Sequence, residues 1–112
     1  MWVGLTWLDS DPTGSRDPDF LWIGDANAFA HEDPIVTIVS GGYTDLISTA
    51  AGHAYTVVWD GLSGASDRAF ASAALLPQVT GAEPWHNNAD EPAALDYNEE
   101  GKTTPQLTSL YD

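Results

Sequence analysis

Oxygen-bearing side chains alternate in one short segment near the start of the chain. Asp9, Asp11 and Thr13 occupy every second position, and Gly14 follows them. Carboxylates at this spacing suit two kinds of chemistry, nucleophilic attack on a phosphoryl group and the binding of a hard divalent cation. The third possibility is a turn in which Asp and Thr side chains bond to neighbouring backbone groups. The same residues therefore support a catalytic, a metal-binding and a purely local structural interpretation.

The pattern Asp9-Ser10-Asp11-Pro12-Thr13 follows an apolar segment and resembles the first motif of haloacid-dehalogenase-type phosphatases, Asp-x-Asp-x-Thr after a strand. The resemblance implies that Asp9 attacks the phosphoryl group and that Asp11 acts as acid and base. Ser40 then stands in the place of the family's second motif. The family also uses a Lys ahead of its last acidic motif, whereas Lys102 follows the acidic residues 90–91 here. We keep such a phosphatase as an alternative and predict no catalytic residue.

Other candidate sites are incomplete. Segment 9–15 looks like the start of an EF-hand calcium loop, but Phe20 stands where that loop has its bidentate Glu. Ser63 lacks the Gly-x-Ser-x-Gly pattern that exposes a nucleophile. The histidines lie near acidic residues without the i, i+4 spacing of a helical metal pair: His31, His53 and His86. The sequence therefore predicts no metal site, no cofactor and no enzymatic activity.

The composition is strongly acidic. The 112 residues include 17 Asp and Glu against 3 Lys and Arg, so the formal net charge is −14. Proteins that bind nucleic acids neutralise phosphates with Lys and Arg, and anionic membranes repel such a chain, so both direct partners are excluded. There is no Cys for a disulfide or a thiolate site. No basic start or long apolar run indicates a signal peptide or membrane span, and we expect a cytoplasmic protein.

The charge is concentrated in two flanks, residues 1–33 and 83–112, around a nearly neutral centre. We expect these flanks to converge on folding and to bind a partner, together with one tryptophan. The expected partner-binding residues are Asp9, Asp11, Asp17, Asp19, Asp25, Glu32, Asp33, Glu83, Trp85, Asp90, Glu91, Asp96, Glu99 and Glu100.

Hydrophobic patterning predicts one α+β domain over residues 1–112, with about four strands and two to three short helices. The expected strands are 2–8, 20–23, 35–39 and 54–59. The expected helices are 45–51, capped by Thr44 and closed by Gly52, 66–76, capped by Ser66 and stopped by Pro77, and 92–97. One or two helical turns are expected over 25–31, and a loosely ordered tail over 98–112.

Five tryptophans suggest either a packed core or an aromatic binding surface. Four lie in apolar, strand-like sequence and are expected in the core: Trp2, Trp7, Trp22 and Trp59. Trp85 lies between Pro84 and His86 in polar surroundings, so we expect it to be exposed. An exposed Trp among carboxylates is typical of a protein interface.

Self-repulsion of so many carboxylates opposes folding, so the charge implies a function. The small size, the acidity and the lack of Cys resemble the acidic DNA-mimic inhibitors of phages and mobile elements, of anti-CRISPR or anti-restriction type. The resemblance is compositional and transfers no motif. It implies a monomer or weak homodimer in the host cytoplasm that excludes DNA from a basic host protein or nucleoprotein complex. The alternatives are an acidic accessory or halophilic protein, which the excess of Asp over Glu suits, and a virion component.

Overall fold

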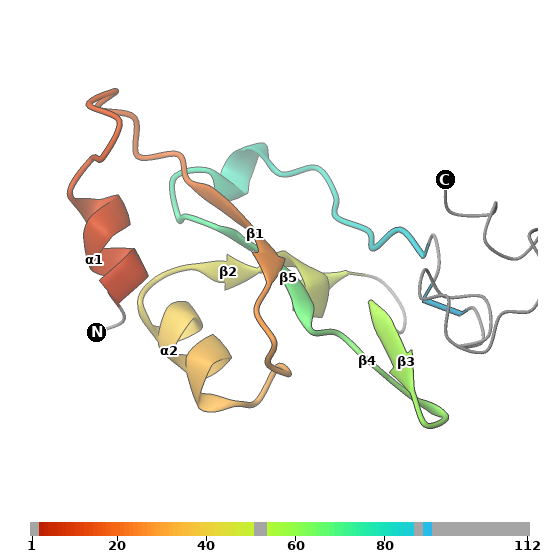
Figure 1. Cartoon of the computed structure of the whole chain (residues 1–112). Coiled ribbons are helices and arrows are strands. Elements are labelled where there is room, and N and C mark those ends of the chain that lie inside the picture. Colours follow the sequence, from red (N-terminus) through yellow and green to blue (C-terminus); the bar gives the residue numbers. More distant parts are fainter. Residues whose placement is uncertain (1–2, 51–53, 87–88, 91–112) are drawn as a thin grey trace, which may run out of the picture.

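A computed structural model describes residues 3–50, 54–86 and 89–90 (Figure 1). The helices are α1 (Val3–Asp9), α2 (Asp33–Ser40), α3 (Leu46–Thr49) and the short 3-10 helix η1 (Leu76–Gln78). The strands are β1 (Leu21–Asp25), β2 (Thr44–Asp45), β3 (Val57–Trp59), β4 (Leu62–Gly64) and β5 (Asp67–Ala71). The chain is therefore α+β, as its hydrophobic patterning predicts.

Two antiparallel sheets organise the described residues. The larger has the order β1-β5-β2, with Trp22 opposite Phe70 and Asp25 opposite Asp67. The smaller is the β3–β4 hairpin, in which Trp59 pairs with Leu62. Asp60 and Gly61 form its turn with φ angles of 50° and 77°, the positive values that a type I′ turn requires. Figure 1 shows this hairpin on the far side of the larger sheet from α1.

The core lies between the larger sheet and the helices α1 and α2. Phe70 of β5, Leu5 of α1 and Ile35 and Ile38 of α2 are almost fully buried. Ile35 and Ile38 are three residues apart, so they lie on the same face of α2, and burying that face holds the helix on the sheet. Trp22 packs against Phe70 with ring centroids 5.3 Å apart.

Three predicted elements are wrong. Residues 3–9 and 33–40 are helices, where strands were expected over 2–8 and 35–39. Residues 67–71 are a strand, where a helix was expected over 66–76. The apolar segments are short, so periodicity alone did not separate the two states, and tertiary packing decided them. The predicted turns of helix over 25–31 are also absent, since only turns and bends follow β1 until α2 begins.

Other predicted elements agree more closely. Strands 20–23 and 54–59 correspond to β1 and to β3, although both boundaries shift. The helix predicted over 45–51 is α3, and its cap is Asp45, one residue after the expected Thr44. Gly52, the helix predicted over 92–97 and the tail 98–112 lie outside the described residues.

The tryptophans do not fill the core as expected. Trp22 is half-buried against Phe70, but Trp7 and Trp59 are exposed. Trp7 is exposed because α1 turns Leu5 inward, and Trp59 because it lies at the tip of the hairpin. Trp85 is exposed, as predicted. Trp2 lies outside the described residues.

Candidate partner-binding surface

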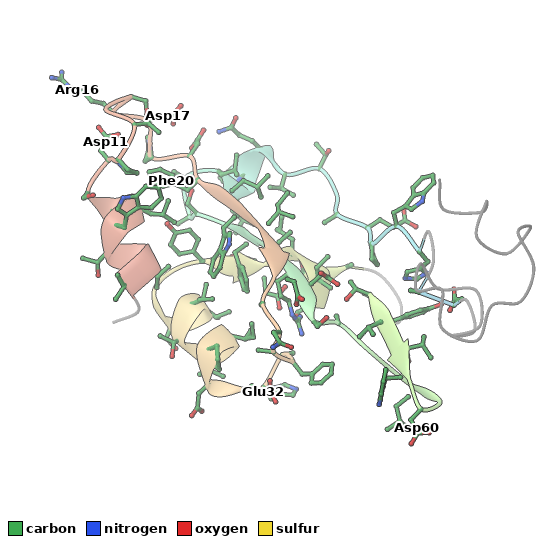
Figure 2. All side chains as sticks on the ribbon, viewed as in Figure 1. Asp11, Arg16, Asp17, Phe20, Glu32 and Asp60 are labelled. Atoms are coloured by element: carbon green, nitrogen blue, oxygen red, sulfur yellow. The ribbon has the colours of Figure 1, made fainter. Side chains whose placement is uncertain are left out.

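The described carboxylates of the N-terminal flank do not converge as expected, because strand β1 separates them into two groups, one at each of its ends. Asp11, Asp17 and Asp19 belong to the α1–β1 loop, residues 10–20, which leads into the strand. Asp25 ends β1, and Glu32 lies just before α2. Figure 2 shows Asp11 and Asp17 together at the upper left and Glu32 well apart from them at the bottom of the view. Asp19 and Asp25 are six positions apart along extended chain, a span of about 20 Å.

The remaining predicted residues extend this distribution. Asp9 ends α1 beside the α1–β1 loop, and Asp33 begins α2 next to Glu32. Glu83, Trp85 and Asp90 are exposed on the segment that follows η1. The other four lie outside the described residues: Glu91, Asp96, Glu99 and Glu100.

Four surface carboxylates are held in place by backbone amides. Asp11 Oδ2 accepts a hydrogen bond from the Arg16 amide at 3.1 Å, and Asp17 Oδ1 accepts one from the Asp19 amide at 3.0 Å. The same arrangement recurs at the other end of β1, from the Asn27 amide to Asp25 Oδ1 at 2.8 Å and from the Phe29 amide to Glu32 Oε2 at 2.9 Å. We call these the amide-held carboxylates: Asp11, Asp17, Asp25 and Glu32. Each uses one oxygen locally, so its direction is set before any partner arrives.

Basic side chains neutralise little of this surface. Arg68 is buried in an ion pair with Asp45, the only ion pair among the described residues. Arg16, at the tip of the α1–β1 loop, is the only exposed Lys or Arg in the described part of the chain. The surface therefore carries a strong excess of negative charge.

A hollow of about 520 Å³ lies between the α1–β1 loop and the core. Its lining includes Asp9, Asp11, Arg16, Tyr43 and Ser72. Burial and, next, the nearby charge of Asp9 raise the pKa of the Tyr43 hydroxyl above its ordinary value of 10.0. Asp11 Oδ1 is buried there without a hydrogen-bond partner. The hollow thus holds a neutral phenol beside carboxylates.

The structure removes the context that the phosphatase motif requires. Asp9 ends helix α1, and Ser40 ends helix α2, whereas the motif needs each residue to follow a strand. No group of three or more His, Cys, Asp or Glu side chains that could hold a metal ion occurs within residues 3–50, 54–86 and 89–90.

The histidines have local partners or lie at the surface. His86 stacks on Tyr55 with ring centroids 3.9 Å apart, and its Nε2 lies 2.6 Å from the Tyr55 carbonyl oxygen. The Tyr55 hydroxyl donates to Asp90 Oδ1 at 2.7 Å, and this bond, with smaller effects of desolvation and charge, raises the pKa of Tyr55 above 10.0. His31 is exposed, and His53 lies outside the described residues.

Sequence reasoning missed an apolar surface. Leu21 and Ile23 of β1 are exposed, and the sequence predicted a strand here without predicting an exposed apolar face. The alternation of Leu21 and Ile23 with Trp22 could have indicated this surface. Alternate residues of a strand face opposite sides of the sheet, so when one side is covered, one of the two sets is exposed.

No family model matches the chain, and no curated protein or solved structure is similar to it. In the described part of the chain, every helix is too short or too polar to cross a bilayer.

Proposed function

We propose that this protein is a non-enzymatic inhibitor that binds a basic, DNA-binding host protein or nucleoprotein complex and keeps DNA out of its cleft. The observation that carries the proposal is the three exposed members of the amide-held carboxylates, Asp17, Asp25 and Glu32, which lie at both ends of β1. A DNA-binding cleft attracts phosphates with Lys and Arg, and a folded protein that presents fixed carboxylates can occupy it instead.

Pre-orientation matters because a flexible carboxylate loses side-chain entropy when it forms an ion pair, and exposed pairs contribute little after that loss. The backbone amides restrict Asp17 and Asp25 before binding, so less entropy is lost on contact. Arg16 is the only exposed Lys or Arg in the described residues, so little local positive charge competes with a partner for these carboxylates.

Because the two ends of β1 are about 20 Å apart, the spacing of the basic groups on the partner can be predicted. A partner that contacts both ends needs basic groups on either side of a region that accepts the apolar side chains of Leu21 and Ile23. Such a partner would bind this protein more tightly than an unstructured acidic chain of equal charge.

The test compares two sets of isosteric substitutions. One set neutralises the α1–β1 loop (Asp11→Asn, Asp17→Asn, Asp19→Asn), and the other neutralises the opposite end (Asp25→Asn, Glu32→Gln, Asp33→Asn). Amide side chains retain an oxygen for the backbone N–H, so the turns remain while the charge is lost. Each set removes the same charge and is therefore the other's control for net charge.

The measurement is the displacement of a fluorescent DNA duplex from purified CRISPR surveillance complexes and restriction endonucleases. For a complex that the parent protein inhibits, at least one set is expected to weaken inhibition about ten-fold, from exposed contacts of about 0.5 kcal/mol each. Inhibition by the parent is expected to weaken as salt rises from about 50 to 200 mM. Inhibition that neither set changes, or displacement of DNA from none of these complexes, contradicts the proposal.

A further inference from the structure

Within the part of the chain that the structure describes, strand β1 has an unpaired edge. It lies at the end of the order β1-β5-β2, and among these residues it pairs with β5 alone. The Ser72 amide donates to the Phe20 carbonyl, and the Ala26 amide donates to the Ser66 carbonyl, so the even-numbered residues of this segment bond to β5. Backbone groups alternate in direction along an antiparallel strand, and the N–H and C=O groups of Leu21, Ile23 and Asp25 therefore point away from β5. Such an edge is a template for another strand.

A groove of about 400 Å³ runs along this edge. It is lined by Gly4, Trp7 and Leu8 of α1 and by Leu21, Trp22 and Ile23 of β1. Successive side chains of a strand point to opposite faces, so a hollow that touches Leu21, Trp22 and Ile23 together lies along the edge and not on one face. Gly4 has no side chain to fill the space between helix and strand. We call this hollow the edge groove.

The side chains at the edge groove define what fits it. Trp7, Leu21 and Ile23 are 61%, 53% and 68% exposed, so the middle of the groove presents apolar surface. Asp19 precedes β1, and Asp25 ends it opposite Asp67 of β5. A complementary segment has alternating apolar side chains in its middle and Lys or Arg at both ends.

Charge argues against a second copy of this chain as the occupant. Pairing of two β1 strands would bring together two chains that each carry a formal charge of −14. It would also place the Asp19 and Asp25 carboxylates of both copies along one short ladder, where like charges are destabilising. Lys and Arg side chains of a basic partner would instead be attracted to these carboxylates.

We infer that the edge groove binds an extended segment of the basic partner, flanked by Lys or Arg, as an additional antiparallel or parallel strand on β1. This inference rests on the proposed function for the basic character of the partner and adds where that partner is held. Main-chain hydrogen bonds to Leu21, Ile23 and Asp25 supply affinity, and the apolar middle with basic ends supplies selectivity.

The probe is a synthetic peptide in which Val and Thr alternate between Lys pairs. Two N-methylated forms have the same composition, one methylated at the Val amides and the other at the Thr amides. Because only one set faces β1, one form is expected to lose at least about ten-fold in affinity while the other binds as the parent does. A version with Glu in place of Lys is expected not to bind. Equal binding of both methylated forms, or no binding of the parent peptide, overturns the inference.

Substitution in the protein gives a second test. Ile23→Pro removes an amide hydrogen that points away from β5, and Pro is tolerated at such edge positions. Ile23→Val is the matched control, since it keeps the N–H and an apolar, β-branched side chain that suits a strand. We expect only Ile23→Pro to lose about ten-fold in peptide affinity, with circular dichroism unchanged for both variants. If Ile23→Pro unfolds, the methylated peptides decide the question on the unaltered protein.

Different experimental results would contradict the proposed function and the edge inference. If neutralising the carboxylates abolishes DNA displacement but Ile23→Pro changes neither displacement nor peptide binding, the edge inference falls and the proposed function stands. If the peptide binds at the edge but no DNA-binding complex is inhibited, the proposed function falls. If sedimentation shows that the parent protein is a dimer and that Ile23→Pro is a monomer, the edge binds a second copy of the chain. That result overturns the inference that a basic partner binds there.

Discussion

The guanidinium of Arg68 lies 2.7 Å from the Asp45 carboxylate, and their side chains are only 3% and 5% exposed. Asp45 also caps α3 by accepting hydrogen bonds from the Ile47 and Ser48 amides, and Arg68 donates to the Ala65 carbonyl at 2.8 Å. The pair thus connects β5, the start of α3 and the residue after the hairpin. A chain with few basic residues uses one of them inside the fold.

Asp45→Asn is expected to destabilise the protein by about 3–5 kcal/mol, because it leaves the Arg68 guanidinium buried without a counter-charge. The measurement is urea unfolding followed by circular dichroism. Asp67→Asn is the matched control, since Asp67 is exposed and adjacent to Arg68 in sequence. It is expected to be neutral or slightly stabilising because Asp67 lies opposite Asp25. A loss below about 1 kcal/mol for Asp45→Asn would show that the pair adds little.

Sequence patterning predicted the fold class better than the identity of its elements. Ile35-Val36-Thr37-Ile38-Val39 is rich in β-branched residues, yet it forms α2 because Asp33 and Pro34 suit a first helical turn and Ile35 and Ile38 share a buried face. In β5 the alternating residues Arg68 and Phe70 are buried, although the neighbouring alanines also fit helical spacing. Pairing with β1 and β2 decided the outcome, and a local pattern does not contain that information.

The candidate surface was predictable only in its composition. Acidity and a turn of Asp, Pro and Gly indicated exposed carboxylates, and the structure places Asp17 and Asp25 at the surface. Their separation by β1 follows from the strand between them. The edge groove depends on the packing of α1 beside β1, and it was not predictable because residues 2–8 were expected to form a strand and not a helix.

Gly41 marks a close approach between α2 and α1. A Cβ atom at Gly41 would lie 2.5 Å from Leu5 Cδ1, and Leu5 is almost fully buried. Gly41→Ala is therefore expected to destabilise the protein by about 1–3 kcal/mol through overpacking. In a double-mutant cycle measured by urea unfolding, Leu5→Ala should remove this penalty. Equal penalties for Gly41→Ala with and without Leu5 would contradict the contact.

Ser72 fastens the α1–β1 loop to the sheet. Its hydroxyl donates to the Pro18 carbonyl at 2.9 Å and accepts from the Phe20 amide at 2.9 Å. Ser72→Ala is expected to cost about 1–3 kcal/mol, because the partners of a buried hydroxyl are left unsatisfied. Hydrogen exchange at the Phe20 amide should accelerate more than at the Ala26 amide, which bonds to Ser66 at the other end of the strand. Equal acceleration at both amides would indicate general destabilisation instead.

The Tyr43 hydroxyl is expected to titrate above its ordinary pKa of 10.0, chiefly because of burial and next because of Asp9. A raised pKa in the folded state means that the neutral phenol contributes stability below the unfolded pKa and that this contribution is lost as pH rises through the folded pKa. Asp9→Asn should lower the pKa of Tyr43 but leave it above the ordinary value, because burial remains. The measurement is phenolate absorbance against pH in a background where Tyr43 is the one remaining tyrosine (Tyr55→Phe, Tyr97→Phe, Tyr111→Phe), with Asp60→Asn at the distant hairpin as the control. A pKa of Tyr43 that responds to Asp60→Asn as strongly as to Asp9→Asn would mean that net charge, and not the neighbouring carboxylate, sets it.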